Sequence, residues 1–182
     1  MLTINDTFPA FQLKAVEAGP SEQFIDISDQ SFNGLWKIYF FWPLDFTFVC
    51  PTEIAEFGKL NNQFFDRQTQ VLGTSVDSEY VHLAWKRQEK SLQSLPFPML
   101  ADTTRQLSNA LGILDPKTGV AQRATFIVDP THVIRFAMVT DNNVGRNPKE
   151  VLRVLDALQT DELCPCNWEK GQQTLNSQLT LA

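Results

Sequence analysis

The residue best placed to do chemistry in this chain is a cysteine at the predicted start of a helix. In the stretch from residue 41 to residue 53, FWPLDFTFVCPTE, a buried strand gives way to a short loop and then to a helix whose first turn holds Cys50. Unpaired backbone N–H groups and the positive end of the helix dipole favour an anion at such a place. The thiolate is the nucleophilic form of cysteine, so this position predicts a reactive thiol.

Thr47 lies three residues before Cys50. On a tight helical entry its hydroxyl can lie beside the sulfur and hydrogen-bond to a molecule bound there. Pro51 fits the same helix start because the first turn needs no intrahelical N–H partner. The residues alone leave a second interpretation open, in which Cys50 is a small buried hydrophobic side chain and Thr47 is an ordinary helix cap.

The elements that must position these side chains follow from apolar periodicity and from cap and turn residues. Residues 36–42 (WKIYFFW) are aromatic and β-branched over a short run, which is typical of a buried strand. Residues 51–67 carry apolar side chains at helical spacing. The other predicted elements are strand 70–77, a helix capped by Ser78 and running through 85–90, strand 99–101, helix 106–111, strands 124–129 and 133–140, and a helix opened by Asn147 and Pro148.

This order of elements predicts a fold. Strands joined through helices should pair in parallel by right-handed crossovers, whereas strands joined by Pro130-Thr131-His132 should form an antiparallel hairpin. We therefore expect an α/β protein with a thioredoxin-like fold, in which a central mixed sheet is flanked by helices and extended by N-terminal strands. From Asp161 the pattern becomes polar and irregular. The expected division is one domain over residues 1–160 and a C-terminal tail over 161–182.

Composition narrows the class of function. The formal net charge is −6 and the pI is near 4.9, which argues against a nucleic-acid surface. No apolar run reaches the roughly 18 residues of a membrane helix, and no signal peptide is evident at the start, so we expect a cytoplasmic protein with no membrane contact. Three cysteines are too few for a disulfide scaffold; in a reducing compartment, cysteines that form disulfides usually do so transiently, as catalysts or sensors.

The stretch PLDFTFVCPTE resembles the active-site motif of the peroxiredoxins, P-x-x-x-T-x-x-C, in the form used by alkyl hydroperoxide reductase C. Pro43, Thr47 and Cys50 occupy the three motif positions. The family also uses an arginine before a strand, and Arg123 in QRATFIVD matches it. The resemblance extends over nearly the whole chain, from Phe8 to the tail at Cys164.

The resemblance implies a thiol peroxidase and assigns roles to its residues. Cys50 would be the peroxidatic thiolate, and Thr47 would help to hold the peroxide. Arg123 would stabilise the charge on the thiolate and on the developing alkoxide, and Pro43 would shield the pocket from water. Three further positions match a supporting shell in the family: Glu53, Trp85 and Arg146. Glu53 is expected to pair with one of the two arginines; without the resemblance it could equally be a helix-face carboxylate, and Trp85 a core residue.

The resemblance also implies a role for the C-terminal tail. Cys164 in ELCPC resembles the resolving cysteine, which in this family forms a disulfide with the peroxidatic cysteine of another subunit. A homodimer with reciprocal disulfides follows, which the family assembles into rings of dimers such as decamers. The first turn of the Cys50 helix would have to unwind, because a disulfide cannot span more than about 7 Å between Cα atoms. Cys166 resembles the third cysteine of actinobacterial forms, and is expected to be an alternative resolver, a relay or a spare thiol.

The implied partners are a hydroperoxide and an external disulfide reductant, which could be thioredoxin, a flavoprotein reductase or a small CxxC reductase; no cofactor and no metal are expected. Three other functions are possible alternatives for such a chain. A thioredoxin-like disulfide carrier needs C-x-x-C, and Cys50 has no such neighbour. A zinc module needs closely spaced ligands, and His82 and His132 lie far from any cysteine in the sequence. A redox-dependent holdase chaperone is supported by the family resemblance alone.

Overall fold

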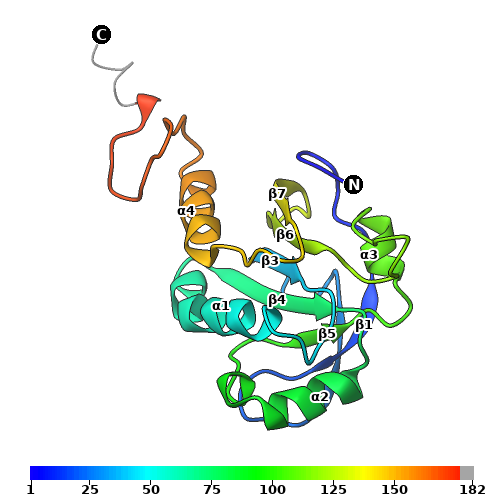
Figure 1. Ribbon diagram of the computed structural model, residues 1–182. Helices are drawn as coiled ribbons and strands as arrows, with labels where there is room; N and C mark the ends of the chain where they lie inside the picture. Colours follow the sequence, from blue (N-terminus) through cyan, green and yellow to red (C-terminus); the bar gives the residue numbers. More distant parts are fainter. Residues whose placement is uncertain (177–182) are drawn as a thin grey trace.

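The computed structural model describes residues 1–176, and its core is one sheet with helices on both faces (Figure 1). In the described part of the chain the sheet has seven strands in the order β2-β1-β5-β4-β3-β6-β7. Their bounds are β1 Gln12–Val16, β2 Phe24–Ser28, β3 Trp36–Phe41, β4 Thr69–Ser75, β5 Met99–Ala101, β6 Arg123–Val128 and β7 Ile134–Thr140.

The sheet is mixed, as expected. Strand β4 pairs in parallel with both β3 and β5, through crossovers that contain helices. Strand β6 is antiparallel to β3 and to β7, and β1 is antiparallel to β2 and β5. The central strands of such a sheet are buried on both faces, which explains the nearly continuous apolar run of β3.

Helices α1 (Cys50–Phe65), α2 (Glu79–Gln88) and α4 (Pro148–Gln159) cover one face of the sheet, together with the short 3₁₀ helix η1 (Lys90–Leu92). Helix α3 (Gln106–Ala110) and the N-terminal segment cover the other. Alternate residues of β3 serve the two sides: Ile38 and Phe40 pack under α1, whereas Tyr39 and Phe41 pack in the second cluster. Two hydrophobic cores therefore share one strand.

Gly73 on β4 lets two aromatic rings lie directly on the sheet. A Cβ at this position would be 2.8 Å from Cζ3 of Trp42 and 3.0 Å from Cζ of Phe40, which is closer than real Cβ atoms approach. The indole of Trp42 is fully buried there, immediately after β3, and its backbone N–H donates to the Thr74 carbonyl. The absence of a side chain at residue 73 thus fixes where the chain leaves the sheet toward α1.

The predicted fold class and the predicted elements are confirmed, with boundaries that differ by a few residues. Ser78 caps α2 by accepting from the Val81 N–H, and Asn147 caps α4 by accepting from the Lys149 N–H. The separate tail over 161–182 stays a prediction: α4 ends at Gln159, and residues 177–182 lie outside the described part of the chain.

Candidate active site

Cys50 is the first residue of α1 and is completely buried, and its thiol is free. The sequence sets this position because Pro51, at the next residue, is tolerated only in the first turn of a helix. The preceding residue, Val49, is the N-cap, and no side chain caps the helix. Pro51 has no N–H, and the N–H groups of Thr52 and Glu53 donate to the Val49 carbonyl, so what the helix start brings to the sulfur is the positive end of its dipole, which favours negative charge.

Thr47 lies against the cysteine sulfur, as its spacing suggested. Its Oγ1 is 2.9 Å from Cys50 Sγ and 2.9 Å from the Leu44 carbonyl oxygen. A hydroxyl has one proton, so Thr47 can donate to only one of these acceptors at a time. The alternative in which Thr47 is an ordinary helix cap is wrong, because Val49 holds the cap position and the Thr47 hydroxyl faces the sulfur.

Arg123, the first residue of β6, reaches the same sulfur. Its Nη1 donates to Cys50 Sγ at 3.2 Å and to Glu53 Oε2 at 2.6 Å, and its Nε donates to the Asn142 carbonyl at 2.8 Å. The side chain is 4% exposed, so its charge is poorly screened by solvent. A buried guanidinium at this distance is placed to interact with negative charge on the sulfur or on an oxygen bound next to it.

Glu53 pairs with both arginines and not with only one of them. Its two carboxylate oxygens accept from Nε of Arg146 at 2.7 Å, from Nη2 of Arg146 at 3.0 Å and from Arg123 as described above. The backbone N–H of Arg146 donates to Glu53 Oε1 at 2.7 Å as well. Two guanidinium groups around one carboxylate leave an excess of positive charge next to Cys50.

Burial and the two neighbouring arginines together determine the pKa of the Glu53 carboxyl. Burial by itself would raise the pKa of the Glu53 carboxyl, but the hydrogen bonds and charge of Arg146 and the charge of Arg123 outweigh it, and the pKa is lowered. Arg146 is fixed further by donating from Nη1 to the Ala124 carbonyl at 2.6 Å, and its guanidinium lies 5.5 Å from the centre of the Phe40 ring. The arrangement is a rigid, charged frame behind the sulfur.

The other two predicted residues lie on the loop side of the site. Pro43 opens the loop 43–49 and is half-buried. Trp85 on α2 is buried, with its ring centre 6.4 Å from that of Trp42 and 5.9 Å from that of Phe46. Trp85 is therefore a core residue whose ring also lies near Phe46 of the loop, and its supporting role stays a prediction.

The sequence reasoning missed a buried pair beneath this loop. Nδ1 of His82 on α2 is 2.6 Å from Oδ2 of Asp45, and neither side chain is more than 1% exposed. Asp45 falls inside the motif stretch, two residues before Thr47, but no pattern in the sequence connects it with a histidine 37 residues away. His82 was considered only as a zinc ligand, and its neighbours do not fit that role.

The tail cysteines lie elsewhere in the chain. Cys164 is half-buried at the end of α4, where its sulfur is 3.5 Å from Thr160 Oγ1 and 3.8 Å from the Ala157 carbonyl oxygen. Cys166 is exposed, and both cysteines line a cavity of about 830 Å³ with Arg135 and Arg153. The contacts of Cys164 are with Thr160 and Ala157, whereas those of Cys50 are with Thr47 and Arg123, and both thiols are free.

Comparison with known proteins agrees with this geometry. The model of the AhpC/TSA family matches residues 4–137. The chain belongs to the AhpC/TSA family. It is 53% identical to alkyl hydroperoxide reductase C of Mycolicibacterium smegmatis, over 100% of this chain and 97% of that protein. It is 54% identical to alkyl hydroperoxide reductase C of Mycobacterium tuberculosis H37Rv, over 97% of this chain and 95% of that protein.

Solved structures of the AhpC/TSA family have the same fold. AhpC of Mycobacterium bovis superposes with a TM-score of 0.86 at 53% identity, covering 93% of this chain and 99% of that chain. A reduced 2-Cys peroxiredoxin of Plasmodium vivax superposes with a TM-score of 0.90 at 31% identity, covering 99% and 100%. These similarities confirm the predicted resemblance to alkyl hydroperoxide reductase C, the prediction that the chain is an enzyme, and its activity class as a thiol peroxidase.

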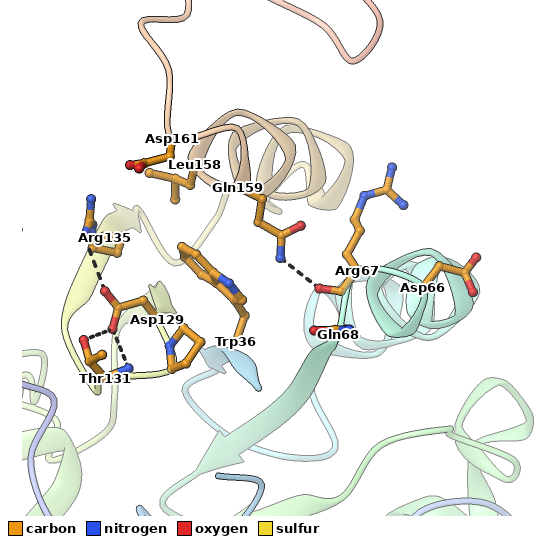
Figure 2. A pocket seen from close by; sticks show the side chains of 11 residues that line it. Trp36, Asp66, Arg67, Gln68, Asp129, Thr131, Arg135, Leu158, Gln159 and Asp161 are labelled. Atoms are coloured by element: carbon orange, nitrogen blue, oxygen red, sulfur yellow. Dashed lines mark hydrogen bonds and ion pairs between the residues drawn. The ribbon is translucent and has the colours of Figure 1, made fainter. Parts of the chain in front are cut away.

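A second cavity in this AhpC/TSA protein, of about 590 Å³, opens at the far end of β3 from Cys50 (Figure 2). Its polar side chains are engaged with one another: Asp129 accepts from Arg135 and Thr131, and the Gln159 amide donates to the Arg67 carbonyl. No cysteine lines it.

Within 1–176, no group of three or more histidine, cysteine, aspartate or glutamate side chains could hold a metal ion. Over the same residues, no helix combines the length and the apolar character needed to cross a membrane.

Proposed function

We propose that this protein reduces hydrogen peroxide, organic hydroperoxides and peroxynitrite, with Cys50 as the peroxidatic residue. The observation that carries the proposal is the position of Cys50 Sγ, 2.9 Å from Thr47 Oγ1 and 3.2 Å from Arg123 Nη1 at the start of α1. A hydrogen-bond donor, a buried cation and the positive end of a helix dipole converge on one sulfur. Such an environment activates a thiol and stabilises anionic oxygen.

In the first step, the Cys50 thiolate attacks one oxygen of the hydroperoxide in line with the O–O bond. The S–O bond forms as the O–O bond breaks, and the leaving alkoxide or hydroxide takes a proton to become an alcohol or water. Cys50 is oxidised to the sulfenic acid and the peroxide is reduced. Thr47 and the backbone N–H of Cys50 hold the peroxide oxygens, and Arg123 stabilises the charge that moves from sulfur to oxygen.

The supporting residues act through this frame. Glu53 fixes the planes of the Arg123 and Arg146 guanidinium groups by charge-assisted hydrogen bonds. Trp85 supports the loop from α2, and Pro43 limits access of water to the sulfur.

In the second step, Cys164 of the partner subunit attacks the sulfenic sulfur, and water leaves as the Cys50–Cys164 disulfide forms. The first turn of α1 must open, because Cys50 is completely buried in the reduced protein. The lack of a side-chain cap at Val49 supports this opening, since capping side chains stabilise helix starts by about 1 kcal/mol. Cys166, exposed and two residues from Cys164, serves as an alternative resolver or passes the disulfide onward.

An external dithiol then reduces the disulfide: thioredoxin, a flavoprotein reductase or a small CxxC reductase. Resolution between subunits makes the homodimer the working unit. We extend the proposal to a ring of dimers built on the loop 43–49, where Phe46 and Phe48 are 51% and 96% exposed. Three free cysteines suit a reducing compartment such as the cytoplasm.

Non-reducing gel mobility after one equivalent of hydrogen peroxide tests these assignments with wild type, Cys50→Ser, Cys164→Ser and Cys166→Ser. We expect a covalent dimer in the wild type and in Cys166→Ser, and none in the other two variants. A dimer that survives in Cys164→Ser but disappears in Cys166→Ser would move the resolving role to Cys166. Peroxide consumption that survives in Cys50→Ser would overturn the function itself.

A further inference from the structure

The loop that carries Thr47 contains one partner of a buried ion pair, and the proposed peroxidatic mechanism gives this pair no role. The pair joins Asp45, within the loop, to His82 on α2 at 2.6 Å. Both side chains are shut off from solvent. Burying a charge costs free energy unless the charge is paired and hydrogen-bonded. A buried pair in this position therefore suggests a structural role for Asp45 and His82.

Asp45 is fixed at both its side chain and its backbone. Its Oδ1 accepts from the indole Nε1 of Trp42 at 2.7 Å, and its N–H donates to Asp77 Oδ2 at 2.8 Å. Asp77 is itself held by the Ser75 hydroxyl at 2.8 Å. Asp45 therefore ties the loop to β3, to α2 and to the end of β4 at once.

Geometry determines the charge of His82. Its Nδ1 faces the Asp45 carboxylate, and its Nε2 is 3.0 Å from the Leu100 carbonyl oxygen. Both partners are acceptors only, and a neutral imidazole has a single N–H. Only the imidazolium can donate to both, so His82 is a cation in this arrangement.

The surroundings favour that charged form. Burial by itself would lower the pKa of His82, but the charge and hydrogen bond of Asp45, the hydrogen bond to the Leu100 carbonyl and the charge of Asp77 raise it above its ordinary value. The charged groups that face the ring are thus Asp45 from the loop and Asp77 from the end of β4. Strand β5 contributes only a carbonyl, and Trp42 contributes an uncharged ring 5.7 Å away.

The residue between Asp45 and Thr47 has a backbone conformation that needs stabilising contacts. Phe46 has a φ of 56°, in the left-handed region that aromatic side chains rarely adopt. Such a conformation persists only when its surroundings enforce it. Asp45 holds the residue before Phe46, and Trp85 lies against the Phe46 ring.

We propose that the ion pair of Asp45 with protonated His82 positions the loop 43–49 so that Thr47 meets Cys50, and that loss of the His82 proton releases the loop. The inference rests on the proposed function, because it gives the pair its effect through Thr47. His82 is a positioning residue, since it touches neither the sulfur nor the peroxide site. Its charge makes peroxide reduction sensitive to alkaline pH.

The sign of the effect follows from the direction of the pKa shift. A raised pKa means that His82 stays charged through neutral pH and loses its proton as the pH rises further. The rate constant for oxidation of Cys50 by hydrogen peroxide should therefore fall on the alkaline side. In His82→Gln it should be lower by about tenfold or more at neutral pH, as expected for a misplaced catalytic group, and the alkaline fall should be absent.

The first experiment is single-turnover oxidation of the reduced protein by hydrogen peroxide, followed by stopped-flow fluorescence from pH 6 to pH 9.5. The variants are His82→Gln and Asp45→Asn, with His132→Asn as the matched control because His132 lies in the β6–β7 turn, far from the loop in the fold. The control should follow the wild type. An unchanged rate and pH profile in both loop variants would overturn the inference.

The second experiment needs no variant of the pair, so it decides the question even where His82→Gln fails to fold. The chain has two histidines, and ¹⁵N-histidine NMR, assigned with His132→Asn, reports the protonation of His82 directly. Both ring nitrogens should be protonated at pH 7, and the midpoint of deprotonation should coincide with the alkaline fall in the wild-type rate. A neutral His82 at pH 7, or a midpoint unrelated to the rate, would refute the proposal.

Failure of this inference and failure of the proposed function give different results. If Cys50→Ser abolishes peroxide reduction while the loop variants behave as wild type, the function stands and the positioning role falls. If the wild type consumes no peroxide, the function falls, and the NMR titration still decides whether His82 is the buried cation.

Discussion

Arg123 and Cys50 are 73 residues apart in the sequence, yet Nη1 of the arginine donates to the cysteine sulfur at 3.2 Å. The same nitrogen donates to Glu53, which lies on the first turn of the helix that Cys50 begins. The Nε of the same side chain donates to the Asn142 carbonyl at 2.8 Å, beyond the end of β7. Arg123 therefore links the first turn of α1, through both the sulfur and the carboxylate, to the loop that follows β7.

Arg123→Lys should slow oxidation of Cys50 by roughly 10²–10³-fold, the cost of removing one well-placed donor at a developing oxyanion. Lysine keeps the charge but lacks the planar fork that reaches the sulfur, Glu53 and the Asn142 carbonyl together. Stopped-flow measurement of the second-order rate constant with hydrogen peroxide checks this. Arg87→Lys, in an exposed ion pair with Glu22, is the control and should leave the rate unchanged.

Glu53→Gln should destabilise the protein by about 3–5 kcal/mol at pH 7, because it leaves two buried guanidinium groups without their counter-charge. Urea unfolding followed by circular dichroism measures the loss. Glu56→Gln removes the carboxylate of an exposed pair with Lys59, and its effect should be small. A Glu53→Gln variant as stable as Glu56→Gln would contradict the assignment of Glu53 as the buried counter-charge.

The stability of the wild type should also depend on acid through Glu53. Its pKa is lowered below the ordinary value of 4.5, so the folded state binds this proton more weakly than the unfolded chain does. The stabilisation is therefore fully present above pH 4.5 and is lost as the pH falls through the folded pKa. The free energy of unfolding should drop more steeply with acid in the wild type than in Glu53→Gln, and parallel curves would exclude this contribution.

Trp168→Ala should separate the two chemical steps. Trp168 is buried in the tail, its indole donates to the Gln172 carbonyl, and its own carbonyl accepts from Arg153. Removing the indole should loosen the segment that presents Cys164 and leave the Cys50 pocket intact. Mass spectrometry should find Cys50 oxidised at the wild-type rate, with less disulfide and more sulfinic acid. Slower oxidation of Cys50 with normal disulfide yield would be the opposite result.

Thr74→Val should raise the free energy of unfolding by about 0.5–1 kcal/mol. Among the described residues, the Thr74 hydroxyl is the buried side-chain group that has no hydrogen-bond partner, and valine has nearly the same shape. Thr125→Val on β6 is the matched comparison, because Thr125 is also a buried strand threonine but its hydroxyl accepts from Arg146 at 3.3 Å. That variant should lose stability, and a loss in Thr74→Val would indicate a partner for its hydroxyl.

Local patterns in the sequence predicted most of the fold. The aromatic run of β3, the helical spacing after Pro51 and the hairpin around Pro130 are short-range signals, and each produced the expected element. Thr47 and Cys50 were also predictable, because three residues at a helix start leave little choice of geometry. Strand and helix ends shifted by a few residues because caps and turns compete locally.

The long-range pairs could not be read from the chain in the same way. The bidentate contact between Glu53 and Arg146 spans 93 residues, and the contact between Asp45 and His82 spans 37. Neither pair has a periodic signature, since each forms only after strands, helices and loops have been brought together. The family resemblance indicated the first pair, whereas the second emerged from the folded geometry alone.

The packing at Gly73 constrains how the sequence of this protein can evolve. The space left by its missing side chain is filled by Trp42, whose indole N–H holds Asp45 beneath the catalytic loop. A substitution at residue 73 would push the indole away and disturb peroxide chemistry from a strand that touches no substrate. Mutational drift at this interior position is therefore tied to selection on activity, and residues 73, 42 and 45 should be replaced together or not at all.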